Sequence, residues 1–147
     1  MLRLQPFWEK RASARDQNTM ATEAEKSSIA ENFIAALRNR DWKLLHTLFT
    51  EDAVWSLPGS SLISGEAQGA DAVVVRARLI TSYNLTFTLK HILIGQYGVA
   101  LSLNNTAERD GKILDEHLAT VFSLRNGKIA RIDTYLSDVD MANAFFV

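Results

Sequence analysis

The chain has 147 residues, of which 47% are hydrophobic, and its 16 lysine and arginine residues nearly balance its 17 aspartate and glutamate residues. This length suits one globular domain with a sizeable core, and the near-neutral charge leaves no basic footprint for nucleic acid or an anionic membrane. The absence of cysteine excludes disulfides, thiolate nucleophiles and zinc–thiolate sites.

The sequence also argues against a metal site and against a membrane-spanning segment. His46, His91 and His117 lack the spacing of metal ligands on one element, and no apolar run approaches the roughly 20 residues that span a bilayer. We therefore expect no metal, no cofactor, no nucleic-acid partner and no membrane partner. Residues 1–26 lack the continuous apolar core of a secretory signal. This predicts a cytoplasmic protein with a flexible N-terminal extension over residues 1–26, followed by one domain over residues 27–147.

Helical signals dominate the first half of that domain. Ser28 and Glu31 have the spacing of a capping box, and Asp41 can cap a second helix. A short strand is predicted over residues 53–57, then a serine- and glycine-rich loop over residues 60–69, and a third helix from about residue 70 to 82. The apolar residues at helical spacing in the three helices are Ile29, Phe33, Ile34, Leu37, Trp42, Leu45, Leu48, Phe49, Val73, Val74, Ala77 and Ile80.

Four consecutive strands follow, and they determine the fold class. Asp110-Gly111 and Asn126-Gly127 are strong hairpin signals, which make the sheet antiparallel. After the sheet, Ser137 or Asp138 can cap a short C-terminal helix. Apolar and polar residues alternate, as in half-buried strands, over residues 86–94, 99–107, 113–124 and 129–136.

This order of elements resembles the nuclear transport factor two fold, and local motifs resemble those of SnoaL-like proteins. The resemblance implies a conical α+β barrel, in which a curved antiparallel meander sheet wraps around three N-terminal helices and a short C-terminal helix follows. It implies no single reaction, because the fold hosts several enzymes and non-catalytic binders. Residues 33–42 resemble the first helix and turn of SnoaL-like proteins, and residues 51–59 resemble their first strand. Residues 65–69 resemble the loop that follows, and residues 126–129 with Tyr135 resemble the last hairpin.

Strand alternation predicts which side chains point into the cone, if the more apolar set lines its concave face. A β-bulge would reverse the assignment beyond it. The few polar residues in this set are typical of a pocket for a small hydrophobic molecule. The inward set is Phe87, Leu89, His91, Leu93, Val99, Leu101, Leu103, Asn105, Leu114, Glu116, Leu118, Thr120, Phe122, Ala130, Ile132, Thr134 and Leu136. We expect ligand contacts from Phe33, Trp55, Leu57, Leu103, Asn105, Thr120, Phe122 and Thr134.

Two reactions of the superfamily are disfavoured by the residues at the matching positions. Ketosteroid isomerase needs a carboxylate base and two donors to an enolate oxygen, and the chain has Leu57, Phe33 and Thr120 there. Limonene-epoxide hydrolase uses two aspartates and an arginine. The aspartate positions match Thr134 and Asn105, and the arginine position matches Leu103.

Cyclisation of the SnoaL type needs only one general acid or base in a hydrophobic cavity. His91 and Glu116 are the catalytic candidates, because histidine titrates near neutrality and a glutamate on an apolar face must pair or hold its proton. Three interpretations stay open: a cofactor-independent isomerase, cyclase or dehydratase, a non-catalytic binding protein, and a dimerisation module. A homodimer is expected through the outer sheet face, which carries Ala119, Val121 and Tyr135.

Overall fold

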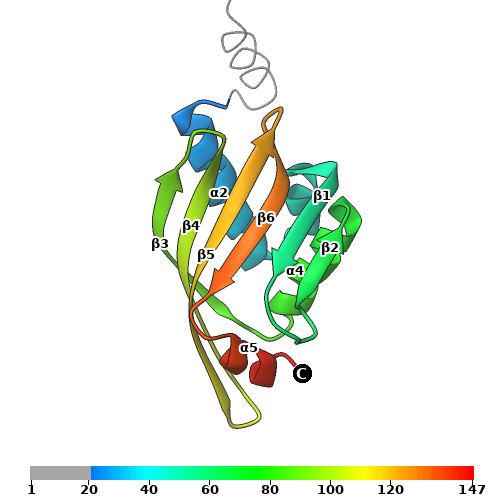
Figure 1. The fold of residues 1–147 in the computed structure, drawn as a ribbon, viewed down its shortest axis with the longest axis vertical. Coiled ribbons are helices and arrows are strands. Elements are labelled where there is room, and N and C mark those ends of the chain that lie inside the picture. Colours follow the sequence, from blue (N-terminus) through cyan, green and yellow to red (C-terminus); the bar gives the residue numbers. More distant parts are fainter. Residues whose placement is uncertain (1–20) are drawn as a thin grey trace, which may run out of the picture.

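The computed structural model describes residues 21–147, so the predictions for residues 1–20 lie outside the described residues. The described chain is an α+β fold with a curved sheet (Figure 1). Its helices are α2 (Glu23–Asn39), α3 (Trp42–Thr47), α4 (Ala70–Thr81) and α5 (Val139–Phe145). Its strands are β1 (Phe49–Leu57), β2 (Gly65–Gln68), β3 (Thr86–Ile94), β4 (Gly98–Arg109), β5 (Lys112–Arg125) and β6 (Lys128–Leu136).

The N-cap of the first described helix, α2, lies six residues before the predicted N-cap Ser28. This N-cap is Thr22, and the Thr22 side chain accepts a hydrogen bond from the backbone N–H of Glu25. The predicted start was wrong because Thr22 provides the same capping chemistry upstream. Lys26, expected in the extension, is buried and donates from Nζ to the carbonyl oxygens of Gly95 (2.8 Å) and Gln96 (3.0 Å). The start of α2 is thereby tied to the β3–β4 turn.

The sheet has six strands in the order β2-β1-β6-β5-β4-β3. The predicted antiparallel meander is confirmed for β3 to β6, but β1 pairs with β6 in parallel, so the whole sheet is mixed. The segment predicted as a loop over residues 60–69 contains β2, which pairs antiparallel with β1. A strand of only four residues is too short to show a clear alternation in the sequence.

Both predicted hairpin turns have the backbone that their residues favour. Asp110 and Gly111 have φ values of 52° and 77°, and Asn126 and Gly127 have φ values of 52° and 75°. Left-handed conformation at both central residues matches the twist of the flanking strands. Of the two candidate caps for the last helix, it is Asp138 that accepts from the backbone N–H of Met141, at 2.9 Å.

The core lies between the concave face of the sheet and the helices. α2 contacts β3 and β4, α4 contacts β1, and α5 contacts β5 near the end of β6 (Figure 1). Phe33 of α2 is at the centre of an aromatic cluster, with edge-to-face ring contacts to Phe49 (6.4 Å between centroids), Trp55 (6.3 Å) and Phe122 (4.8 Å). Offset and edge-to-face rings at these distances attract one another beyond their burial of apolar area.

A β-bulge in β3 overturns part of the predicted face assignment. Leu89 pairs with Leu103, but His91 pairs with Ser102, so one residue of β3 is left unpaired between them. Beyond the bulge the alternation is reversed. Ile92 therefore packs against the core, and His91 and Leu93 are exposed. The prediction that His91 points into the cone is wrong. A second irregularity, between β5 and β6, makes Ile129 the buried residue instead of Ala130.

Candidate functional site

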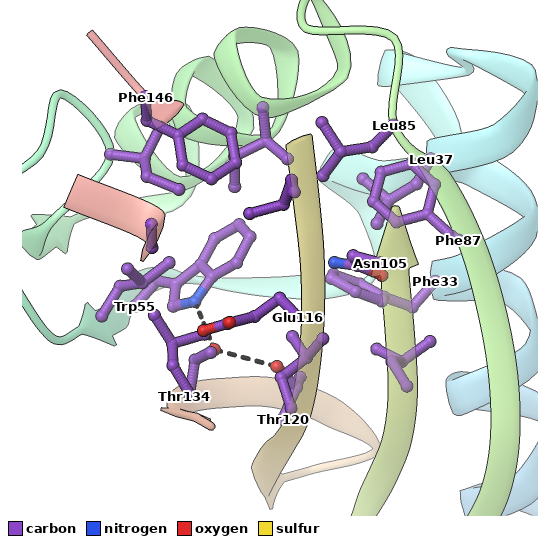
Figure 2. A pocket seen from close by; sticks show the side chains of 18 residues that line it. Phe33, Leu37, Trp55, Leu85, Phe87, Asn105, Glu116, Thr120, Thr134 and Phe146 are labelled. Atoms are coloured by element: carbon purple, nitrogen blue, oxygen red, sulfur yellow. Dashed lines mark hydrogen bonds between the residues drawn. The ribbon is translucent and has the colours of Figure 1, made fainter. Parts of the chain in front are cut away.

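A cavity lies inside the cone, between the sheet, α2, α4 and the C-terminal segment (Figure 2). Its volume of about 50 Å³ accommodates a few water molecules. A ligand larger than this enters only if lining side chains move. The cavity is lined by Phe33, Leu37, Trp55, Leu57, Ile63, Ile80, Leu85, Phe87, Leu103, Asn105, Leu114, Glu116, Leu118, Thr120, Thr134, Leu136, Ala142 and Phe146.

Most of the predicted ligand-contacting residues line this cavity. Phe33, Trp55, Leu57, Leu103, Asn105, Thr120 and Thr134 do so, together with the catalytic candidate Glu116. Phe122 is not part of the lining but supports it through its ring contact with Phe33. His91 does not line it, because the bulge in β3 turns the residue outward. The two predicted catalytic residues are therefore not brought together.

Several lining residues come from segments for which the sequence predicts no position relative to the cone. Ile63 lies between β1 and β2, Leu85 lies between α4 and β3, and Ala142 and Phe146 lie in and after α5. Their apolar character could be read from the sequence. Their place in the cavity depends on tertiary packing, which no local spacing encodes.

Glu116 is the acidic residue of the cavity wall, and its side chain is 3% exposed. Burial raises its pKa above the usual value of 4.5, and the nearby Asp138 charge acts in the same direction. The backbone N–H of Asp138 donates to Oε1 (3.3 Å) and the Ser137 hydroxyl donates to Oε2 (3.5 Å), which opposes part of that shift. This carboxyl is suited to hold a proton at a higher pH than an exposed glutamate.

Asn105 lies directly opposite Glu116, on the neighbouring strand β4. It is 9% exposed, and its Oδ1 is buried without a hydrogen-bond partner among residues 21–147. An unpaired buried amide oxygen costs roughly 1–3 kcal/mol. Such a group in a native structure calls for an explanation, for example an ion, a water or a ligand. Its position on the cavity wall favours a ligand.

The second polar part of the cavity wall consists of three side chains linked by hydrogen bonds. The Trp55 indole N–H donates to the Thr134 hydroxyl at 3.0 Å, and the Thr134 and Thr120 hydroxyls share a hydrogen bond of 2.8 Å (Figure 2, dashed lines). Three donor hydrogens are present, one indole N–H and two hydroxyls, and the two hydrogen bonds use two of them. Whichever threonine donates to the other, one hydroxyl hydrogen remains to be offered to a ligand.

The same chain of contacts fixes the direction of the Trp55 side chain. Trp55 points inward, where its ring contacts Phe33 and its N–H reaches Thr134. Arg76 of α4 stacks over the ring at 5.8 Å and donates to the Trp55 carbonyl oxygen at 2.7 Å. The first interaction holds the indole in place, and the second ties the backbone of Trp55 to α4. Trp55 is therefore a rigid wall of the cavity.

Residues 21–147 contain no cluster of three or more histidine or acidic side chains placed to bind a metal ion. None of the helices from α2 to α5 has the length and apolar character needed to cross a bilayer.

Several solved structures share this fold. Bal32a, from a soil-derived mobile gene cassette, superposes with a TM-score of 0.79 at 29% identity, covering 84% of this chain and 98% of Bal32a. IdmH from Streptomyces antibioticus, a candidate polyketide cyclase, gives a TM-score of 0.64 at 18% identity, covering 83% of this chain and 99% of IdmH. A candidate ketosteroid isomerase from Kribbella flavida gives 0.66 at 16% identity, covering 78% of this chain and 79% of that chain.

Comparison of sequences agrees with the structural likeness. An uncharacterised protein of Mycobacterium tuberculosis is 25% identical over 131 residues, which cover 86% of this chain and 99% of that protein. Residues 30–132 match the SnoaL-like domain, a segment that runs from α2 into β6 and includes most of the cavity lining. The chain therefore belongs to the SnoaL-like domain family.

Proposed function

We propose that this protein binds a small hydrophobic molecule in the cone and transfers a proton to or from it with Glu116. It would then be a cofactor-independent enzyme of the isomerase, cyclase or dehydratase type. The observation that carries the proposal is a buried carboxyl with a raised pKa in an apolar cavity, opposite an amide whose Oδ1 has no hydrogen-bond partner among the described residues. Buried acids and bases with shifted pKa values in a pocket are frequent in active sites.

The geometry suggests a role for each of the two groups. In its ionised form Glu116 can take a proton from a carbon next to a carbonyl group, and the electron pair of the C–H bond then moves to the carbonyl oxygen. The Asn105 amide can donate a hydrogen bond to that enolate oxygen. The Glu116 carboxyl then returns its proton to carbon, at the original or at a conjugated position. The likeness to IdmH and to the Kribbella flavida protein is compatible with this class of chemistry.

The test is hydrogen exchange in small ketones, which enter the cavity as the lining side chains move. Cyclohexanone and 2-pentanone are incubated with the protein in D₂O, and loss of the α-hydrogen signal is followed by proton NMR. We expect exchange above the buffer rate, and we expect Glu116→Gln to abolish the excess. Exchange that is equal in the wild type and the variant would assign the proton transfer to another group.

A non-catalytic binding protein is the second candidate, and two observations favour it. Glu116 already accepts hydrogen bonds from Asp138 and Ser137, as a residue that only anchors α5 would do. The volume of the cavity is also small. If the ketones bind and no α-hydrogen exchanges, this candidate is preferred. If neither ketone binds, a dimerisation module with a cone filled by its own side chains is preferred.

Steroid isomerisation is expected to be absent. Leu57 and Phe33 line the cavity. They match the positions at which ketosteroid isomerase has its carboxylate base and one oxyanion donor, and neither apolar side chain can act as a base or a donor. Loss of one such donor alone typically costs roughly 100- to 1000-fold in rate. The measurement is the absorbance of the conjugated product from a 5-ene-3-ketosteroid. Turnover above the buffer rate would contradict the matching of these positions.

The protein is expected to be a homodimer that associates through the convex face of the sheet. Tyr135 on this face is 64% exposed, and Leu93 beyond the bulge is also exposed. Exposed aromatic and aliphatic side chains on one face are typical of a contact surface. We expect Tyr135→Glu to convert a dimer into a monomer in light scattering at micromolar concentration. Leu62→Glu is the matched control, because Leu62 is equally exposed at 64% but lies in the loop before β2. A monomeric wild type would contradict the prediction.

A further inference from the structure

The concave face of the sheet alternates polar and apolar rows across its strands. Asn105 and Glu116, the amide–carboxyl pair, form one row. Thr120 and Thr134, the threonine pair, form another. Between them lies the leucine row, made of Leu103, Leu118 and Leu136, which are in register across β4, β5 and β6. All of these residues line the cavity.

The two polar rows are separated by a definite length of strand. Glu116 and Thr120 are both on β5 with one leucine of the leucine row, Leu118, facing the cavity between them. At about 3.3 Å per residue, their Cα atoms are roughly 13 Å apart. Because side chains converge over a concave sheet, the gap between their polar atoms is shorter. Figure 2 shows the Asn105 amide and the threonine pair on opposite sides of Glu116.

Each polar row has hydrogen-bonding capacity that the described residues do not use. The Oδ1 atom of the Asn105 amide is buried without a hydrogen-bond partner among residues 21–147. The Trp55–Thr134–Thr120 chain has one hydroxyl hydrogen left over. A ligand with a polar group at one end only would satisfy one row and leave the other unpaired.

We infer that the ligand carries two oxygen functions joined by an apolar segment. One oxygen function is held by the amide–carboxyl pair, the apolar segment lies on the leucine row, and the second oxygen function accepts from the threonine pair. This inference rests on the proposed function for the first oxygen. It adds that the threonine pair is a specificity-determining site for the far end of the molecule.

The experiment compares ligands that differ at the far end only. Three hydroxyketones (4-hydroxy-2-butanone, 6-hydroxy-2-hexanone and 8-hydroxy-2-octanone) are each paired with the methyl-terminated ketone of equal chain length (2-pentanone, 2-heptanone and 2-nonanone). Dissociation constants are measured by calorimetry. At one of the three lengths we expect the hydroxyl to tighten binding by about 3- to 10-fold, the value of one net hydrogen bond. If the hydroxyl weakens binding or has no effect at every length, the inference is overturned.

Variants of the chain locate the effect. In Thr120→Val the Thr134 hydroxyl still accepts from Trp55 and its own hydrogen becomes free, so the preference for the hydroxyl should persist. Combining Thr120→Val, Thr134→Val and Trp55→Phe removes all three donors, and the preference should disappear. Thr88→Val on the exposed side of β3 is the matched control and should leave it unchanged. A preference that survives in the triple variant would overturn the inference.

One further readout keeps the experiment decisive. If the triple variant does not fold, the wild-type NMR signal of the Trp55 indole N–H replaces it. This signal should shift more with the preferred hydroxyketone than with its methyl-terminated partner, and equal shifts would overturn the inference. Binding is measured without turnover, so a failure of proton transfer at Glu116 leaves these affinities unchanged. The two proposals can therefore fail separately.

Discussion

Phe33→Ala is expected to lower the free energy of unfolding by about 3–5 kcal/mol, the usual cost of removing a buried phenylalanine. Phe33 is 2% exposed and its ring contacts Phe49, Trp55 and Phe122. Removing the ring takes away three aromatic contacts at once and leaves a void that the surrounding β-strands cannot close. Urea denaturation of the wild type and the variant measures the difference.

The same substitution also enlarges the cavity, because Phe33 is part of its lining. Benzene is therefore expected to bind Phe33→Ala and to raise its thermal unfolding temperature, as it does for apolar cavities that stay dry. Phe145→Ala is the matched control. Phe145 is equally buried and packs on Tyr83 and Phe146, but it does not line the cavity. A loss below about 1 kcal/mol for Phe33→Ala, or equal stabilisation of both variants by benzene, would contradict this assignment.

The four-stranded meander could be predicted from the sequence because its signals are local. Alternation of apolar and polar residues sets the strands, and Asp110-Gly111 and Asn126-Gly127 set the turns with backbone angles that few other residue pairs adopt. Register then follows, since a slip of one residue would expose the whole apolar face. The same logic placed Asn105, Glu116, Thr120 and Thr134 on the concave face, where they line the cavity.

His91 was misplaced because a single unpaired residue has no clear mark in the sequence. Thr86 to Ile94 alternate without a glycine that would indicate a bulge, and Ile92 is as apolar as Leu93. The choice between the two faces is made by packing, since Ile92 contacts the core opposite Leu101. Tertiary contacts also decide that Phe146 lies against the cavity and that β1 joins the sheet beside β6. These are long-range effects, and no local pattern encodes them.

Glu116→Gln is expected to lower turnover of any substrate by roughly 100-fold or more, because glutamine keeps the size of the side chain but cannot transfer a proton. The fold should survive. Glutamine can still accept from the Asp138 backbone N–H through Oε1, and its amide nitrogen, in place of Oε2, can donate to the Ser137 hydroxyl oxygen. The measurement is the rate of α-hydrogen exchange in cyclohexanone, with Glu108→Gln on the exposed end of β4 as the control.

The pH dependence of the free energy of unfolding distinguishes two states of Glu116: a protonated acid in the cavity, and an ionised carboxylate that only anchors α5. The pKa of Glu116 is raised in the folded protein, so between 4.5 and that raised value the folded state binds more protons than the unfolded state. The free energy of unfolding of the wild type therefore falls as pH rises through this window. Glutamine does not titrate. Relative to the wild type, Glu116→Gln should gain about 1.4 kcal/mol for each pH unit between the two pKa values, and below pH 4.5 the difference should be constant.

These two measurements give different results for the two candidate functions. An enzyme that uses Glu116 loses turnover in Glu116→Gln and shows the relative gain in stability at high pH. A binding protein with the same buried carboxyl shows the gain in stability, while neither form catalyses exchange. If the variant loses stability progressively as pH rises, Glu116 is held as a carboxylate by the Asp138 N–H and the Ser137 hydroxyl. That result would contradict the raised pKa on which the proton-transfer proposal depends.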